Sequence, residues 1–132
     1  MTTMHDPQEP QPLDMRQVAM LNNDLLQRLT DEGVTFTYDE DGDSLFLTIG
    51  PGVAALTEHI VYGIYVRIEP ESLRIVGIDI LQFKNRFLVN NELFKVMFEE
   101  DFNRMRSQGG IAVIEGENAK RLYPLFDAML AR

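Results

Sequence analysis

Residues 34–49 read VTFTYDEDGDSLFLTI, two apolar alternating segments on either side of an acidic turn. The first segment, Val34 to Tyr38, alternates apolar residues with threonine, and the second places Leu45, Leu47 and Ile49 on one side. Alternation with a period of two is typical of a strand with one buried face, and Asp-Gly is a favoured turn dipeptide. These residues therefore predict an antiparallel hairpin.

Two further strands are predicted after this hairpin. Glycine and proline at positions 50–52 interrupt the chain, and residues 60–68 then alternate as a single strand. A turn at residues 70–72 leads into residues 73–81, which are rich in β-branched residues that suit a pleated surface. The pattern predicts an antiparallel four-stranded β-meander over residues 34–81, and residues 111–114 could add a short fifth strand.

Helical spacing of apolar residues flanks this region on both sides. An N-terminal helix is predicted from Met15, with Asp14 as its cap and Gly33 as its stop. A second helix follows Asn90 or Asn91, and a third is expected either to start near Pro124 or to be kinked there, because proline inside a helix costs about 3 kcal/mol. The fold class predicted is α+β, with one N-terminal helix and two C-terminal helices.

Length and composition indicate how the chain is organised. A chain of 132 residues has the usual size of one domain, so residues 13–132 are expected to form a single α+β domain, with the meander at 34–81 and a helical part at 90–132. Residues 1–12 are polar and contain three prolines, which predicts a flexible tail.

Charge and cysteine content argue against several classes of function. The chain has no cysteine, which excludes disulfides and thiolate metal sites, and its net charge of −9 disfavours binding to nucleic acid. No apolar stretch approaches the roughly 20 residues that cross a bilayer, so no membrane association is expected. The amino terminus does not resemble a signal peptide, which favours a cytoplasmic location.

One family resemblance covers about residues 36–86. Tyr38-Asp39, Asp43, Leu45, Leu47, Thr57-Glu58, Gly63-Ile64, residues 75–81 and Lys84-Asn85-Arg86 together resemble the family of domains of unknown function numbered 2283. The resemblance implies a small β-meander and no particular chemistry. Some members look like partners of small toxin-like proteins, which agrees with the basic protein partner that an acidic surface would attract. Arg67 departs from the pattern, since the family tends to have an acidic residue there.

Three groups of residues are candidate sites. Asp39, Asp41 and Asp43 have the spacing that begins a calcium loop, but the twelfth position of such a loop, which needs glutamate, is Gly50. A solvated turn is the simpler interpretation, so no metal is expected. His59 lies beside Glu58 without an accompanying nucleophile, which favours a surface histidine.

The third group is basic and aromatic. Lys84, Arg86 and Lys95, with Phe83 and Phe87 between them, could hold a nucleic-acid strand by phosphate contacts and stacking. The net charge of −9 favours a solvated patch instead, and no cofactor is expected.

Apolar residues on the outer face of the predicted sheet are more informative. Phe46, Val61, Tyr65 and Val76 alternate out of phase with the larger apolar set, so both faces of the sheet need cover. The helices could provide it, or a second subunit could. The predicted interface comprises these four residues with Phe94, Phe98 and Phe102 of the helix at 91–106.

Two functions follow from these patterns. The first is a non-catalytic protein-interaction module that forms a homodimer and could also bind a basic protein partner. The second is a small-ligand-binding protein or enzyme that uses His59 with Asp43, Glu58 and Asp79 in a cleft between sheet and helices.

Overall fold

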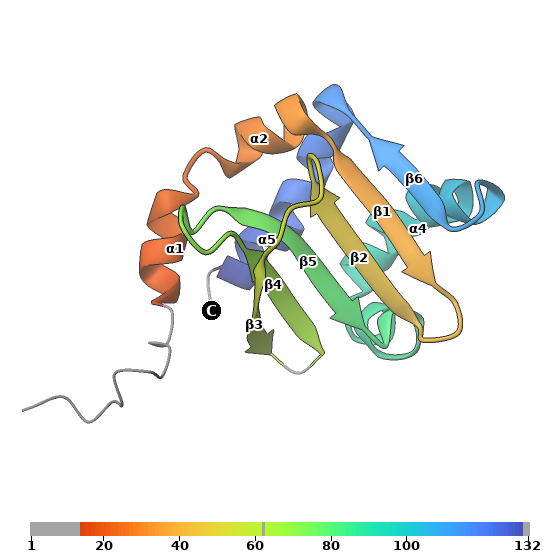
Figure 1. The fold of residues 1–132 in the computed structure, drawn as a ribbon. Helices are drawn as coiled ribbons and strands as arrows, with labels where there is room; N and C mark the ends of the chain where they lie inside the picture. The colour runs from red at the N-terminus through yellow and green to blue at the C-terminus, as the bar shows by residue number, and fades with distance from the viewer. Residues whose placement is uncertain (1–13, 62, 131–132) are drawn as a thin grey trace, which may run out of the picture.

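The computed structural model describes residues 14–61 and 63–130 (Figure 1). The tail expected at residues 1–12 lies outside these ranges. An antiparallel sheet forms the front of the molecule in Figure 1, with α4 and α5 behind it. The α+β class is therefore confirmed.

The sheet has six strands, in the order β3-β4-β5-β2-β1-β6, and every neighbouring pair is antiparallel. The hairpin predicted at 34–49 is present, with Val34 opposite Ile49 and Asp39 opposite Ser44. The short strand expected at 111–114 is also present, paired with β1 at the edge of the sheet. The strands are β1 (Val34–Asp39), β2 (Ser44–Ile49), β3 (Leu56–Val61), β4 (Ile64–Ile68), β5 (Ile75–Leu81) and β6 (Ile111–Ile114).

The prediction of a four-stranded meander is wrong in two respects. Residues 60–68 are not one strand, because the chain reverses between β3 and β4, where Gly63 has a φ of +79°. In addition, β5 pairs with β2, so the chain after β2 crosses to the far edge of the sheet before it returns through β4. Apolar alternation continues across the reversal, so only the glycine in the sequence indicates the turn.

The single N-terminal helix is also two helices in the structure. Helix α1 (Met15–Leu21) begins at Asp14, whose Oδ1 accepts a hydrogen bond from the Arg16 amide at 3.0 Å. Helix α2 (Leu25–Glu32) ends at Gly33, which has a φ of +77°. The break falls at Asn22, which is buried between the two helices and the sheet.

The C-terminal half contains the two expected helices and three short elements that were not predicted. Helix α4 spans Glu92–Ser107, and α5 spans Tyr123–Leu130. Pro124 is the second residue of α5, where the missing N–H has no intrahelical partner to lose. A π-helical turn η1 (Phe83–Phe87) runs into α3 (Leu88–Asn90), and a 3₁₀ segment η2 (Gly116–Leu122) precedes α5.

The hydrophobic core lies on one face of the sheet. The inner sides of the strands pack there against residues from α1, α2, α4, η2 and α5, including Val18, Leu29, Met105, Leu122 and Phe126. Phe46 and Tyr65, on the other face, lie outside this core. Among residues 14–61 and 63–130, the helices thus cover one side of the sheet and leave the opposite face open.

Candidate functional site: the open face of the sheet

Strand register defines the open face as two rows of residues that cross all six strands. Threonines occupy much of it, and between them lie two aromatic residues, one base and one acid. The first row is Ile111, Thr37, Phe46, Asp79, Tyr65 and His59, and the second is Val113, Thr35, Thr48, Gly77, Arg67 and Thr57.

An ion pair stands at the centre of the open face. Arg67 on β4 and Asp79 on β5 are diagonal neighbours, with 2.9 Å between Nε and Oδ1 and only 22% and 18% of their side chains exposed. The N–H is not aimed at the oxygen, so the contact is ionic and not an aligned hydrogen bond. Burial raises the pKa of Asp79, and the charge of Arg67 only partly offsets that rise.

Arg67 lies flat because residue 77 has no side chain. Its Nη2 donates hydrogen bonds to the Leu47 carbonyl at 2.7 Å and to Thr48 Oγ1 at 3.1 Å, so the guanidinium reaches over β5 to β2. A Cβ at Gly77 would stand 2.2 Å from Arg67 Nη2 and 2.6 Å from the Leu47 oxygen. The sequence therefore places a glycine where the arginine must cross the sheet.

Aromatic side chains flank Asp79 of this ion pair, and exposed aliphatic side chains lie at the β6 edge of the same face. Phe46 and Tyr65 flank Asp79 in the first row, and the Tyr65 ring lies 5.2 Å from the His59 ring. Ile111 and Val113 on the edge strand β6 are 52% and 53% exposed, although both are large aliphatic residues. Exposed apolar area next to a flat sheet surface is typical of a contact site.

The predicted interface residues divide between the open face and the interior. Phe46 and Tyr65 lie on the open face, and Val61 lies in the edge strand β3, opposite Ile64. Val76 is only 6% exposed, next to the bulge where β5 holds one more residue than β4, so its side chain is not available to a partner. Val76 alternates in phase with Ile78 and Ile80, which face the core, so the prediction that placed it on the outer face is wrong.

The aromatic residues of α4 point inward. The Phe102 ring lies 4.9 Å from Tyr38 and 5.8 Å from Phe83, and the Phe94 ring stacks 5.8 Å from Phe87. These two side chains join α4 to η1 and the sheet. Phe98 also belongs to α4, but the described part of the structure does not include its side chain.

Asp43 has a structural role beside this aromatic cluster. It accepts hydrogen bonds from the Tyr38 hydroxyl at 2.6 Å and from the amides of Lys84 and Asn85 at 2.9 and 3.1 Å, so it caps the start of η1. Burial acts to raise its pKa, but these hydrogen bonds outweigh burial and the pKa is lowered. Burial and the Asp43 carboxylate together raise the pKa of Tyr38.

The residues of the catalytic alternative do not converge. His59 and Asp79 share a row of the open face, but β4 with Tyr65 separates them. Glu58 alternates with His59 along β3 and so belongs to the other face of the sheet, and Asp43 caps η1 from the turn between β1 and β2. Within residues 14–61 and 63–130, no three acidic or histidine side chains are grouped so that they could hold a metal ion.

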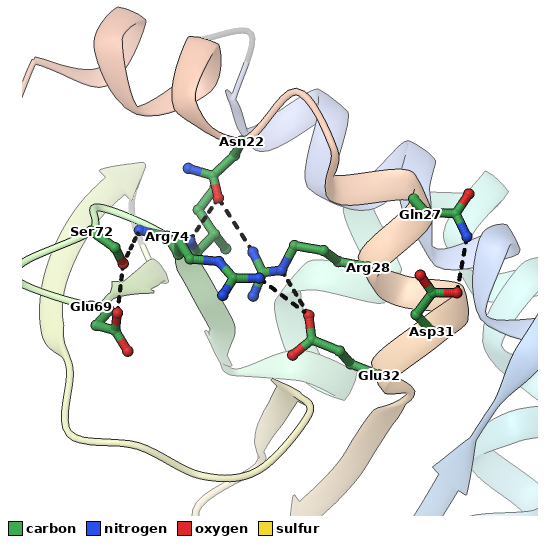
Figure 2. Close-up of polar contacts among 9 residues, drawn as sticks. Asn22, Gln27, Arg28, Asp31, Glu32, Glu69, Ser72 and Arg74 are labelled. Atoms are coloured by element: carbon green, nitrogen blue, oxygen red, sulfur yellow. Dashed lines mark hydrogen bonds and ion pairs between the residues drawn. The ribbon is translucent and has the colours of Figure 1, made fainter.

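A second polar cluster connects the N-terminal helices to the sheet (Figure 2). The buried Asn22 side chain donates to the carbonyls of Val18 and Leu73 and accepts from the Ile75 amide at 2.8 Å. Arg28, with 7% of its side chain exposed, pairs with Glu32 at 2.8 Å. These bonds explain the helix break at Asn22, where the sequence predicted one continuous helix. The cluster has an internal structural role.

Comparison with models of known protein families, with curated proteins and with solved structures found no match to this chain. The resemblance over residues 36–86 therefore stays a prediction. In the described part of the chain, none of the helices combines the length and apolar character needed to cross a membrane.

Proposed function

We propose that this protein is a non-catalytic interaction module that forms a homodimer by packing the open sheet faces of two copies together. The observation that carries this proposal is the open face itself, where Phe46 and Tyr65 lie outside the core and Ile111 and Val113 are about half exposed. Burying such residues is the main driving force of association.

The charges of the open face favour a second copy as the partner. The face carries one base and one acid, Arg67 and Asp79, whereas the whole chain has a net charge of −9. Two neutral faces can meet without the repulsion that other surfaces of so acidic a molecule would suffer. In a two-fold arrangement, each Arg67 can also approach the Asp79 of the other copy.

Binding of a basic protein partner is a separate proposal. The open face does not favour such a partner, because the face has no excess of acidic residues. Such a partner would be drawn to the acidic remainder of the surface. We also propose membership of the family numbered 2283. It rests on the residues of the central strands and turns.

Charge insertion into the open face tests the homodimer. Phe46→Glu would bury a carboxylate without a partner at the interface, which is strongly unfavourable, so we expect the variant to sediment as a monomer. Val96→Glu is the matched control, because Val96 is 73% exposed on α4, and we expect it to leave the association unchanged. Sedimentation velocity of both variants beside the parent protein gives the comparison. Equal association of Phe46→Glu and the parent would refute this interface.

A further inference from the structure

A groove of about 160 Å³ opens on the helical side of the molecule, between η1, α3 and α4. Phe102 and Leu88 are half buried and give it an apolar floor. Its rim carries three bases, Lys84, Lys95 and Arg106, and one acid, Glu99. The groove thus gathers positive charge on a molecule with a net charge of −9.

The three bases at this rim differ from most of the other basic residues. None of them forms an ion pair with any residue in the described ranges, whereas bases elsewhere do, namely Arg28, Arg67, Arg74, Arg104, Lys120 and Arg121. A molecule with 21 acidic residues has ample carboxylates to pair them. Leaving three cations unpaired at one groove makes them available to an external anion.

Two of these cations are held against an aromatic ring. Lys84 Nζ lies 6.0 Å from the centroid of Phe102, and the guanidinium carbon of Arg106 lies 5.8 Å from it. Cation–π attraction draws both charges to the ring, while their mutual repulsion opposes this arrangement. An anion placed between them would relieve the repulsion, and its apolar part could cover the ring.

We propose that this groove binds a small organic anion, with a ring or short apolar group lying on Phe102 and Leu88 and a phosphate or carboxylate held by Lys84 and Arg106. Lys95 adds a third positive charge at the rim. The volume is below the roughly 300 Å³ at which drug-sized ligand pockets begin, which suits one ring with one charged group. A nucleic-acid strand is disfavoured, because the acidic remainder of the surface repels a long phosphate backbone.

A titration followed by amide NMR tests this proposal with phenyl phosphate as the probe. We expect saturable shifts at the amides of Lys84, Phe102 and Arg106. Inorganic phosphate, which has the charge alone, and benzyl alcohol, which has the ring alone, should each bind at least about tenfold more weakly, because each retains only one of the two kinds of contact. Shifts outside the groove only, or equal affinity for phenyl phosphate and either fragment, would overturn the proposal.

Variants that remove charge test whether the bases at the groove contribute to the binding free energy. Lys84→Gln combined with Arg106→Gln should weaken phenyl phosphate binding about tenfold or more, since charge-assisted contacts are lost. Lys120→Gln is the matched control, because Lys120 pairs with Glu117 on η2, away from the groove. These exposed side chains can change without disturbing the core. If the control weakens binding as much as the double variant does, the groove is not the site.

Discussion

Gly77, which has no side chain, determines how the Arg67 side chain lies on the open face. The guanidinium lies over Gly77, bonds to the Leu47 carbonyl and contacts Asp79, so a charged residue occupies the middle of a sheet face at low exposure. With both charges present, the centre of the face is neutral overall and flat. A larger residue at position 77 would remove that arrangement.

Gly77→Ala should lower the free energy of unfolding by about 1–3 kcal/mol, the usual cost of an added methyl group in a packed site. Arg67 can swing away from the new Cβ, but the Leu47 oxygen at 2.6 Å belongs to the backbone and cannot. Gly52→Ala is the control, since no atom lies within 4 Å of the Cβ it would add. Urea denaturation of both variants gives the comparison, and equal losses would contradict the account.

Asp43 makes the free energy of unfolding depend on pH in the acid range. Its folded pKa is lowered from 3.8, so the folded protein holds this proton less tightly than the unfolded chain. The stability it contributes is therefore fully present above the unfolded pKa and is lost as the pH falls through the folded pKa.

Asp43→Asn should flatten this acid dependence, because asparagine keeps the shape and tolerates the φ of 49° but carries no charge to lose. The measurement is the urea midpoint between about pH 5 and pH 2. Asp41→Asn, an exposed change in the same turn, should keep the slope of the parent. The prediction fails if Asp43→Asn loses as much stability on acidification as Asp41→Asn.

At the scale of elements, Asn22 joins three segments. Its side-chain amide donates hydrogen bonds to the Val18 carbonyl at the end of α1 and to the Leu73 carbonyl, and its oxygen accepts one from the Ile75 amide. Asn22 is only 3% exposed. Arg28 Nη1 also approaches its Oδ1 at 3.4 Å. The polar residue that interrupts the apolar stripe is thus the link between the helices and the sheet.

Asn22→Ala should cost about 2–4 kcal/mol of unfolding free energy, because several buried backbone groups would lose their partners together. Asn23→Ala, an exposed change in the same turn, should cost well under about 1 kcal/mol. Thermal or urea unfolding distinguishes the two. Comparable losses would show that the Asn22 bonds contribute little.

Sequence patterns correctly predicted the helices and strands whose own residues carry the pattern. The hairpin at 34–49, the helix α4 and the start of α5 near Pro124 follow from alternation, helical spacing and proline chemistry. The reversal at Gly63 was missed because the apolar alternation is the same on both sides of it. The bulge at Val76 was also missed, because pairing with β4 creates it and the sequence of β5 alone does not show it.

At the scale of the whole molecule, strand order determined which predicted site residues came together. Because β5 lies between β4 and β2, Asp79 stands between Phe46 and Tyr65, and the open face becomes continuous. Alternation in the sequence assigned Phe46 and Tyr65 to this face correctly. It could not show that Phe94 and Phe102 pack inward, because a helical stripe does not reveal which partner covers it.

The central claim is that the open sheet face pairs with a second copy. The most direct measurement is the solution mass of the unaltered protein by sedimentation equilibrium across a dilution series. We predict a species of twice 15.1 kDa that persists on dilution and dissociates only at the lowest concentrations. A mass of 15.1 kDa at every concentration would contradict the claim and would mean that the open face, with Phe46 and Tyr65, is a solvent-exposed surface of a monomer.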